Sequence, residues 1–201
     1  MMNKRQPVKS NTKAAWKPSL AFLRAVEENA TGLRALVSLG PTEPANAHAI
    51  AARLGILVVS LDDIRNLSRE SYDHLVTVDA SVWSGMSVPL AEGQFVVLLH
   101  PRQTRERANV TLAEEAVHVY LKHSPSQLIR NPDGTVRRVY DEAVEREAYW
   151  TAAATLLPSK AVAQAVWHGC SVEAIASMYN VSIELVQFRM KVLRLWRHKT
   201  T

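Results

Sequence analysis

The stretch TLAEEAVHVYLKH, residues Thr111 to His123, is the most informative part of this chain of 201 residues. It lies in a longer segment, 104–121, whose apolar residues recur at helical spacing, so the pattern predicts one long helix. Glu114 and His118 are four residues apart and share one face of that helix. Glu115, three residues before His118, borders the same face. The segment therefore presents two carboxylates and an imidazole close together.

This helix differs by one residue from the H-E-x-x-H motif of zinc peptidases, because Glu114 stands where the first histidine would be. In that motif the two histidines bind the metal, and the glutamate polarises the attacking water. The pattern makes Glu115 the candidate general base and His118 a candidate ligand. A carboxylate can also bind zinc, so Glu114 is a second candidate ligand. Two carboxylates with one imidazole would also admit manganese or iron.

A third ligand has to come from another segment. Residues 141–157 predict a second long helix, which is rich in alanine. Ala148 and Ala152 would let a neighbouring helix approach closely, and Glu145 lies on the same stripe as these alanines. We therefore predict that Glu145 points at the first helix as the third ligand, with Glu147 as an auxiliary carboxylate.

Three interpretations of Glu114 stay open. It binds the metal as a carboxylate, or His123 or His100 completes a rearranged site, or no metal binds and the two helices are scaffold. His123 follows His118 by five residues and lies roughly 140° further around a regular helix. It can therefore reach the same site only if the helix breaks between the two.

Two arginines and two tyrosines are further candidates near this site. Arg105 and Arg107, at the start of the helix, could hold a substrate carboxylate or pair with acidic side chains. Tyr140 and Tyr149 could donate a hydrogen bond to an oxyanion or pack in the core. The predicted strand 94–99 directly precedes the motif helix, and as an edge strand it could pair with an extended peptide.

The predicted elements come in the order helices, small sheet, helices, which is typical of an α+β fold. The predicted helices cover 20–26, 45–54, 104–121, 141–157 and 159–167, and the predicted strands cover 56–61, 74–78, 81–88, 94–99, 128–130 and 136–140. We divide the chain into a flexible basic arm (1–17), a main domain (18–168) and a C-terminal unit (169–201).

The C-terminal unit has the pattern of two short helices joined by a tight turn. Ser171 and Ser182 are candidate N-caps, and Asn180 can adopt the left-handed conformation between the helices. This arrangement is typical of a helix-turn-helix. If the unit binds DNA, a glutamine could contact adenine and basic side chains could reach phosphates. The candidate contacts are Gln187, Arg189, Lys191 and Arg194. The alternative is a helical pair that packs on the main domain.

The net charge of +5 is concentrated at the two ends of the chain. Ten basic residues lie in acid-free segments, 4–17 and 189–199, and the remaining 14 basic residues stand against 19 acidic ones. A uniformly basic nucleic-acid-binding surface is therefore not expected. The single cysteine, Cys170, and the absence of an apolar run of membrane length favour a cytoplasmic protein without a membrane segment.

Several blocks, taken in order, resemble the ImmA/IrrE family of metallo-endopeptidases. They are Arg105-Glu106-Arg107 followed by TLAEEAVH at 111–118, EREAYWTAAATLLP at 145–158, and ASMYNVS at 176–182 followed by Val186 and Arg189-Met190. The chain departs from the family pattern at Glu114 and, in the second block, at Tyr149, Thr151 and Ala154, where Asn, Phe and Glu are usual.

The resemblance implies a zincin-like core with a gluzincin-like site. Glu115 would be the general base, and His118 and Glu145 would be ligands, with Glu114 in the place of the first histidine. It also implies zinc, and cleavage of a repressor or antitoxin-like protein in a mobile element or a stress response. The alternative is an inactive regulator that binds a protein partner or, less favoured, DNA.

Overall fold

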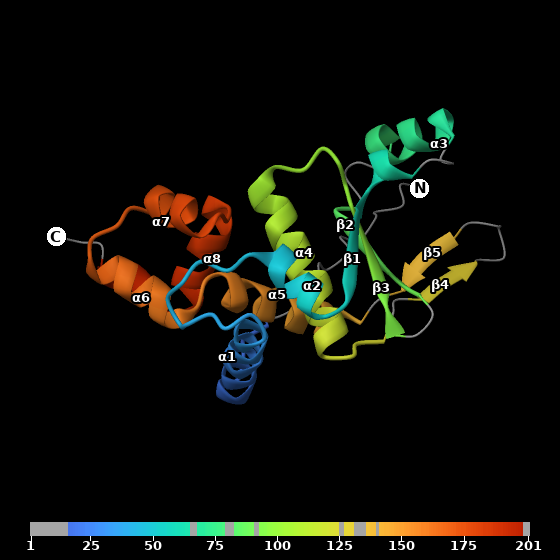
Figure 1. Ribbon diagram of the computed structural model, residues 1–201. Coiled ribbons are helices and arrows are strands. Elements are labelled where there is room, and N and C mark those ends of the chain that lie inside the picture. Colours follow the sequence, from blue (N-terminus) through green and yellow to red (C-terminus); the bar gives the residue numbers. More distant parts are fainter. Residues whose placement is uncertain are drawn as a thin grey trace, which may run out of the picture.

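The computed structural model describes residues 16–64, 68–78, 83–90, 93–124, 127–130, 136–139 and 141–198, with backbone only at 78, 127–130, 136–139, 197 and 198. Within these ranges, most helices lie on one side of a mixed sheet, and a separate pair of antiparallel strands lies on its other side (Figure 1). The α+β prediction is therefore confirmed.

The three-stranded sheet has the order β1-β3-β2. β1 (Ile56–Ser60) runs parallel to β3 (Phe95–Leu99), and β2 (Gly85–Pro89) runs antiparallel to β3. The expectation that the strand at 94–99 is an edge strand is therefore wrong, because it pairs on both sides and buries Val97 completely. β1 and β2 are the two edge strands of this sheet, and β2 lies next to the motif helix.

One predicted strand, at 74–78, is helical in the structure. It forms a single π-helical turn, His74–Val78, directly after α3 (Arg69–Asp73). The β-branched residues favour a strand, but the Thr77 hydroxyl donates to the Asp73 carbonyl across one helical turn. Of residues 74–77, whose burial is described, Val76 is fully buried and Leu75 partly so, and local hydrogen bonding outweighs strand propensity here. The strands predicted at 128–130 and 136–140 are present as β4 (Gln127–Arg130) and β5 (Val136–Val139), which pair antiparallel.

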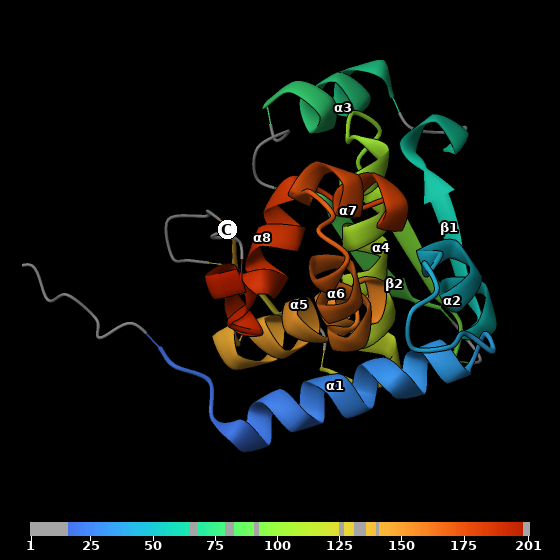
Figure 2. The same ribbon diagram turned by 90° about the vertical axis from the view of Figure 1, so that its left-hand side faces the viewer.

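The motif helix α4 (Arg105–Tyr120) packs against α5 (Glu142–Leu156) in the centre of the molecule. Ala113 and Ala116 of α4 are buried in the same core as Ala148 and Ala152 of α5. Because these side chains are small, the two helix backbones can approach closely, as the alanine-rich pattern predicts. α1 (Leu20–Ala35) crosses the other side of α5, and α2 (Ala47–Arg53) packs on α4 (Figure 2).

The C-terminal helices α6 (Ser159–Trp167), α7 (Val172–Tyr179) and α8 (Ile183–Val192) follow, and η4 (Leu195–His198) is a final 3₁₀ turn. Ser171 and Ser182 cap α7 and α8 as predicted, and Asn180 is left-handed with φ of 50°. Ile175, Leu185 and Met190 share the core of the main helices. The proposed division into separate units stays a prediction. No helix in the described part of the chain is long and apolar enough to cross a membrane.

Candidate functional site

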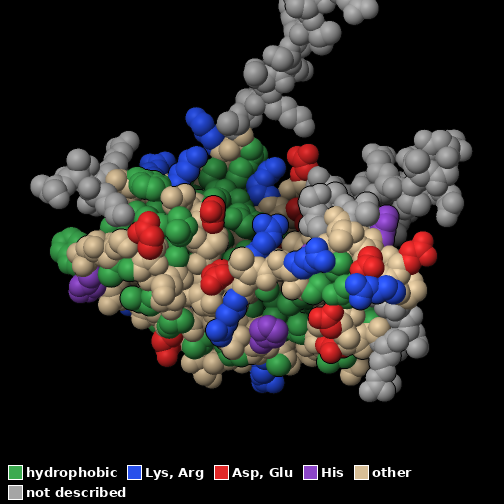
Figure 3. Space-filling model, turned by 90° about the horizontal axis from the view of Figure 1, so that it is seen from above, with side chains coloured by type: hydrophobic (Ala, Val, Ile, Leu, Met, Phe, Trp, Pro, Cys, Tyr) green, Lys and Arg blue, Asp and Glu red, His purple; other side chains and the backbone are tan. Residues whose placement is uncertain are grey.

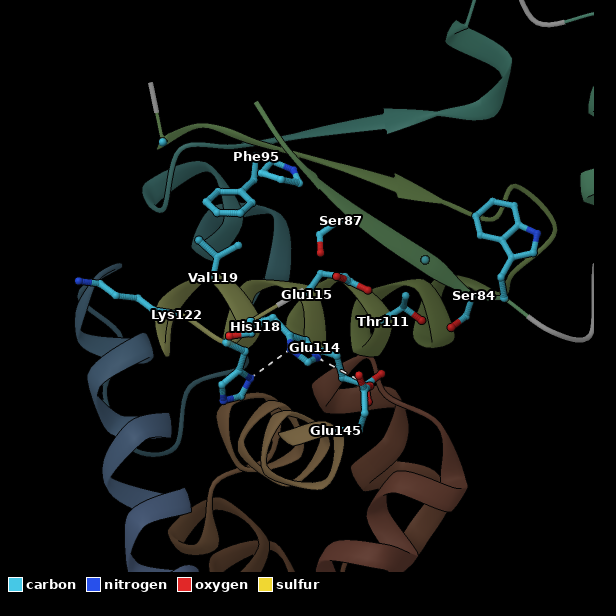
Figure 4. Close-up of a pocket in the computed structure, with 16 residues that line it drawn as sticks. Ser84, Ser87, Phe95, Thr111, Glu114, Glu115, His118, Val119, Lys122 and Glu145 are labelled. Atoms are coloured by element: carbon cyan, nitrogen blue, oxygen red, sulfur yellow. Dashed lines mark hydrogen bonds and ion pairs between the residues drawn. The ribbon is translucent and has the colours of Figure 1, made fainter. Parts of the chain in front are cut away.

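A cavity of about 740 Å³ lies between the edge strand β2, the helix α4 and the start of α5 (Figure 4). Its polar wall is made by side chains from the two helices, and its other wall by β2 and the segments beside it. The polar wall consists of Glu114, Glu115 and His118 of α4 and Glu145 of α5. The three predicted metal ligands and the predicted general base therefore line the same cavity.

The close approach of β2 to α4 depends on Gly85. A Cβ atom at this position would stand 2.6 Å from Cγ2 of Thr111, a buried residue on α4. The Thr111 hydroxyl donates to Oε1 of Gln103 at 3.0 Å, so rotating this buried side chain away would break that hydrogen bond. Glycine therefore sets the width of the cavity at this end, a role that no sequence pattern predicted.

The two adjacent glutamates of the motif point to different sides. Successive helix residues are about 100° apart, so Glu114 and Glu115 cannot share one direction. In Figure 4 Glu115 lies on the side of α4 that faces Ser87 of β2, whereas Glu114 is directed towards Glu145. This separation suits different roles for the two carboxyls.

Burial raises the pKa of Glu114 to about 8. The negative charges of Glu115 and Glu145 contribute to this rise, and the positive charge of Arg107 opposes it. At neutral pH the Glu114 carboxyl is therefore mostly protonated when no cation is present. Burial is the largest cause of the shift, and the charges of Glu115 and Glu145 add a negative potential that a divalent cation would relieve.

His118 lies between two other groups of the site. Its Nε2 is 3.9 Å from Oε2 of Glu145, and its Nδ1 is 3.1 Å from Nδ1 of His123 (Figure 4). His123 in turn places its Nε2 3.5 Å from Oε2 of Glu147. The structure therefore brings His123 to the wall of the cavity, beside His118, and places Glu147 behind His123.

His123 reaches His118 because α4 ends between them. Lys122 is left-handed with φ of 56°. The His123 N–H donates to the His118 carbonyl at 2.9 Å, and the Lys122 N–H donates to the Val119 carbonyl at 3.2 Å. This is the Schellman pattern of a helix C-terminus. The helix therefore ends between His118 and His123, as His123 requires in order to reach the site.

The donors do not form a ready metal cluster. Among the described residues, no group of three or more His, Cys, Asp or Glu side chains is placed so that it could hold a metal ion. His118 and Glu145 form the nearest pair, and Glu114 lines the same cavity. In chemical type, two carboxylates and an imidazole around an electronegative cavity fit a divalent cation.

Two other candidates, His100 and Tyr149, do not line the cavity. His100 is buried beside Trp83, its Nδ1 accepts the Arg102 N–H at 3.1 Å, and it does not line the cavity. The rearranged site with His100 is therefore wrong. Tyr149 packs against Phe188, with ring centroids 5.1 Å apart.

The remaining auxiliary candidates, Arg105, Arg107 and Tyr140, are not seen to line the cavity either. Arg105 and Arg107 are exposed and do not line the cavity, although the charge of Arg107 acts on Glu114. Tyr140 lies outside the described residues. Sequence reasoning also missed Ser87 and Phe95 on the sheet side, since these strand residues carry no motif.

The predicted DNA contacts are only partly accessible. Gln187, Lys191 and Arg194 are exposed. Arg189 is buried, where it donates to the Leu157 carbonyl at 2.9 Å and pairs with Glu27 at 2.5 Å. The expectation that Arg189 reaches phosphates is therefore wrong, because its guanidinium closes the contact between α8, α1 and the end of α5.

The surface charge of the described residues is mixed on the face seen in Figure 3. Lys and Arg side chains there are interspersed with Asp and Glu side chains and do not gather in one large patch. A nucleic-acid footprint is usually a basic patch or stripe. This face therefore does not favour nucleic-acid binding.

Comparison with known families agrees with the geometry. The sequence model of the IrrE N-terminal-like domain, peptidase family M78, matches residues 51–191. The match covers the sheet, α4 and α5 and extends into α8. A comparison with curated proteins gave no match.

Proposed function

Because this chain belongs to the M78 peptidase family of IrrE N-terminal-like domains, we propose that it is a metal-dependent endopeptidase that cleaves a regulatory protein of repressor or antitoxin type. The observation that carries the proposal is the meeting of Glu115, His118 and Glu145 in one cavity beside an edge strand. The residues come from helices about 30 positions apart, and only the close packing of α4 on α5 joins them.

The metal would be held by His118, Glu145 and Glu114. The family is generally zinc-dependent, and manganese or iron would also suit two carboxylates and one imidazole. When bound, the metal would polarise a water molecule and the scissile carbonyl. Binding would require loss of the proton that Glu114 holds at neutral pH in the metal-free protein, so uptake would release a proton.

Glu115 would act as general base. It faces the sheet side of the cavity, where a substrate would lie, and points away from Glu145 (Figure 4). A carboxylate in this position can accept the proton of the attacking water and deliver it to the leaving amine. The different directions of Glu114 and Glu115 would thus separate metal binding from proton transfer.

The edge strand β2 would align the substrate. Within the described residues β2 pairs with β3 on one side only, and Gly85, Ser87 and Pro89 line the cavity. An extended peptide can add to such an edge through main-chain hydrogen bonds. It would then run between β2 and α4, with a backbone carbonyl above the motif. Pro89 has no N–H, so main-chain pairing would stop near this residue.

The alternative is a catalytically inactive regulator that binds a protein partner in the same cavity. One observation favours it: the described donors are not placed as a metal cluster. DNA binding is supported less, because Arg189 is buried. DNA binding would become the better alternative if the protein bound duplex DNA, if this binding weakened steeply with salt, and if it depended on Lys191 and Arg194.

Metal content and a base substitution test the proposal together. The purified protein should contain, or take up on titration, one zinc ion. The zinc-loaded protein should then produce new N-termini in a mixture of randomised peptides, measured by mass spectrometry. Glu115→Gln should abolish these termini and keep the metal, whereas the exposed control Glu28→Gln should change neither. Absence of metal uptake would favour the inactive regulator, and unchanged cleavage by Glu115→Gln would remove Glu115 as the base.

A further inference from the structure

We infer that His123 and Glu147 are positioning residues, which fix the ring orientation and tautomer of His118 so that its Nε2 faces the cavity. The inference rests on the proposed function for its consequence, namely metal binding at that Nε2. Its structural content, a chain of contacts from Glu147 through His123 to His118, stands on geometry alone. We call this chain the Glu147–His123–His118 relay.

The relay begins with the backbone at the end of α4. In a Schellman motif one hydrogen bond joins two residues that are five positions apart, and the side chains of these two residues commonly touch. Here these residues are His118 and His123, and their ring centroids are 4.9 Å apart. An imidazole pair therefore occupies the place where two apolar side chains usually meet. The pair is set by the backbone, and so its geometry does not depend on a bound ligand.

The relay continues through the nitrogen atoms that face one another. The two Nδ1 atoms are 3.1 Å apart, which is a hydrogen-bond distance. One of them must carry the proton and the other must accept it, because two bare or two protonated nitrogens would repel at this distance. A proton on Nδ1 of His118 leaves its Nε2 with a free lone pair. A proton on Nδ1 of His123 reverses the arrangement.

Glu147 selects between these two arrangements. Its Oε2 lies 3.5 Å from Nε2 of His123, closer than the 3.9 Å between Oε2 of Glu145 and Nε2 of His118. The His123 side chain is also less exposed, at 9%, than that of His118, at 19%, so its carboxylate contact is less screened by water. Glu147 therefore favours the proton on Nε2 of His123. His123 Nδ1 is then the acceptor, and His118 donates from its own Nδ1.

The result is the state that a metal ligand needs. A histidine that binds a metal through one nitrogen usually donates its other N–H to a carboxylate, a carbonyl or water. In this protein the acceptor is a second histidine, and the carboxylate lies one residue further out. His123 also lines the cavity, but its two ring nitrogens face His118 and Glu147, so it acts on the metal site through His118. This role differs from the rearranged site, in which His123 would itself be a ligand.

The first test reads the tautomers in the metal-free protein, so it does not depend on the proposed function. Long-range ¹H–¹⁵N NMR in slightly alkaline buffer should show the ring proton of His123 on Nε2 and that of His118 on Nδ1. Glu147→Met should reduce the Nε2-protonated form of His123. The matched control is Glu142→Met, at a more exposed glutamate on the same helix. It should leave both tautomers unchanged. A His123 proton on Nδ1 in the wild-type protein would overturn the inference.

The second test measures zinc affinity in the same variants. Loss of an outer partner of a metal-binding histidine weakens affinity by about 10–100-fold, and we expect this range for His123→Phe and Glu147→Met. His123→Asn should keep most of the affinity, because its amide oxygen can accept the His118 Nδ1–H. Glu142→Met should bind zinc as the wild type does. Thermal unfolding checks that each variant is folded, and Glu147→Met tests the relay without altering the buried ring.

The outcomes separate the two hypotheses. If the wild-type protein takes up no zinc, the proposed function fails, while the tautomers still decide the relay. If zinc binds and His123→Phe has wild-type affinity, the relay is refuted and the proposed function stands. Cobalt substitution provides a further control, since His123→Asn should leave the cobalt absorption spectrum unchanged. A changed spectrum would make His123 a direct ligand and would overturn its role as a positioning residue.

Discussion

Replacing Glu114 by glutamine should stabilise the metal-free protein, and the gain should grow with pH. The folded protein holds the Glu114 proton up to a pKa of about 8, whereas the model value is 4.5. The unfolded chain therefore releases this proton at a lower pH than the folded chain does. Stability is then fully present below pH 4.5 and falls as pH rises towards the folded value. Glutamine is neutral in both states and removes this dependence.

The magnitude follows from the two pKa values. Each pH unit between 4.5 and about 8 changes the free energy of unfolding by about 1.4 kcal/mol. Between pH 5 and pH 7 the advantage of Glu114→Gln over the wild type should therefore grow by about 3 kcal/mol. Glu114 is half-buried, so solvent screening reduces this value only moderately. Protonated glutamate and glutamine have similar shape, and a cavity term is not expected.

The assay is urea unfolding followed by circular dichroism, in buffer with a chelator, at several pH values. The exposed variant Glu28→Gln serves as the control and should follow the wild type at every pH. A stability difference between Glu114→Gln and the wild type that stays constant from pH 5 to pH 7 would refute the reasoning. It would mean that Glu114 titrates in the folded protein as it does in the unfolded chain, and that neither burial nor the charges of Glu115 and Glu145 raise its pKa.

Three further substitutions test the packing around the site, each by the free energy of unfolding. Gly85→Ala should lower the free energy of unfolding by about 1–3 kcal/mol, because its Cβ would meet Cγ2 of Thr111 at 2.6 Å. An unchanged urea midpoint would mean that β2 can move away from α4 freely. Lys122→Gly should add about 1 kcal/mol, since glycine adopts the left-handed conformation without strain, and a loss would contradict the helix ending described above. Arg189→Met should cost about 3 kcal/mol by leaving Glu27 and the Leu157 carbonyl without their donor, whereas wild-type stability would show that the pair is replaceable.

Local sequence patterns were sufficient for the helices that carry the site. Apolar spacing predicted helices at 104–121 and 141–157, and the observed α4 and α5 lie within these ranges. The spacing of Glu114 and His118 on one helix and the alanines around Glu145 predicted that these residues face one cavity. Helical periodicity and capping depend on residues a few positions apart, so a single sequence contains this information.

The strand pairing required the tertiary structure. A strand pattern shows which residues alternate in burial, and it does not show which strands are neighbours. The most apolar strand, 95–99, was expected at the edge and lies in the centre, while 74–78 had no strand partner and became helical. The edge strand next to the cavity is β2. Its close approach to α4 depends on Gly85, which belongs to no recognisable sequence motif.

The sequence by itself determined the fold class, the two site helices and the identity of the candidate base and ligands. Only the tertiary structure decided the environment of these groups. The pKa of Glu114 depends on burial and on Glu145, which α5 brings from 31 positions away. The contact of His123 with His118 depends on a left-handed Lys122, a residue type that rarely signals this conformation. Charge state and side-chain contact are set by neighbours in space, and those neighbours become known only when the chain has folded.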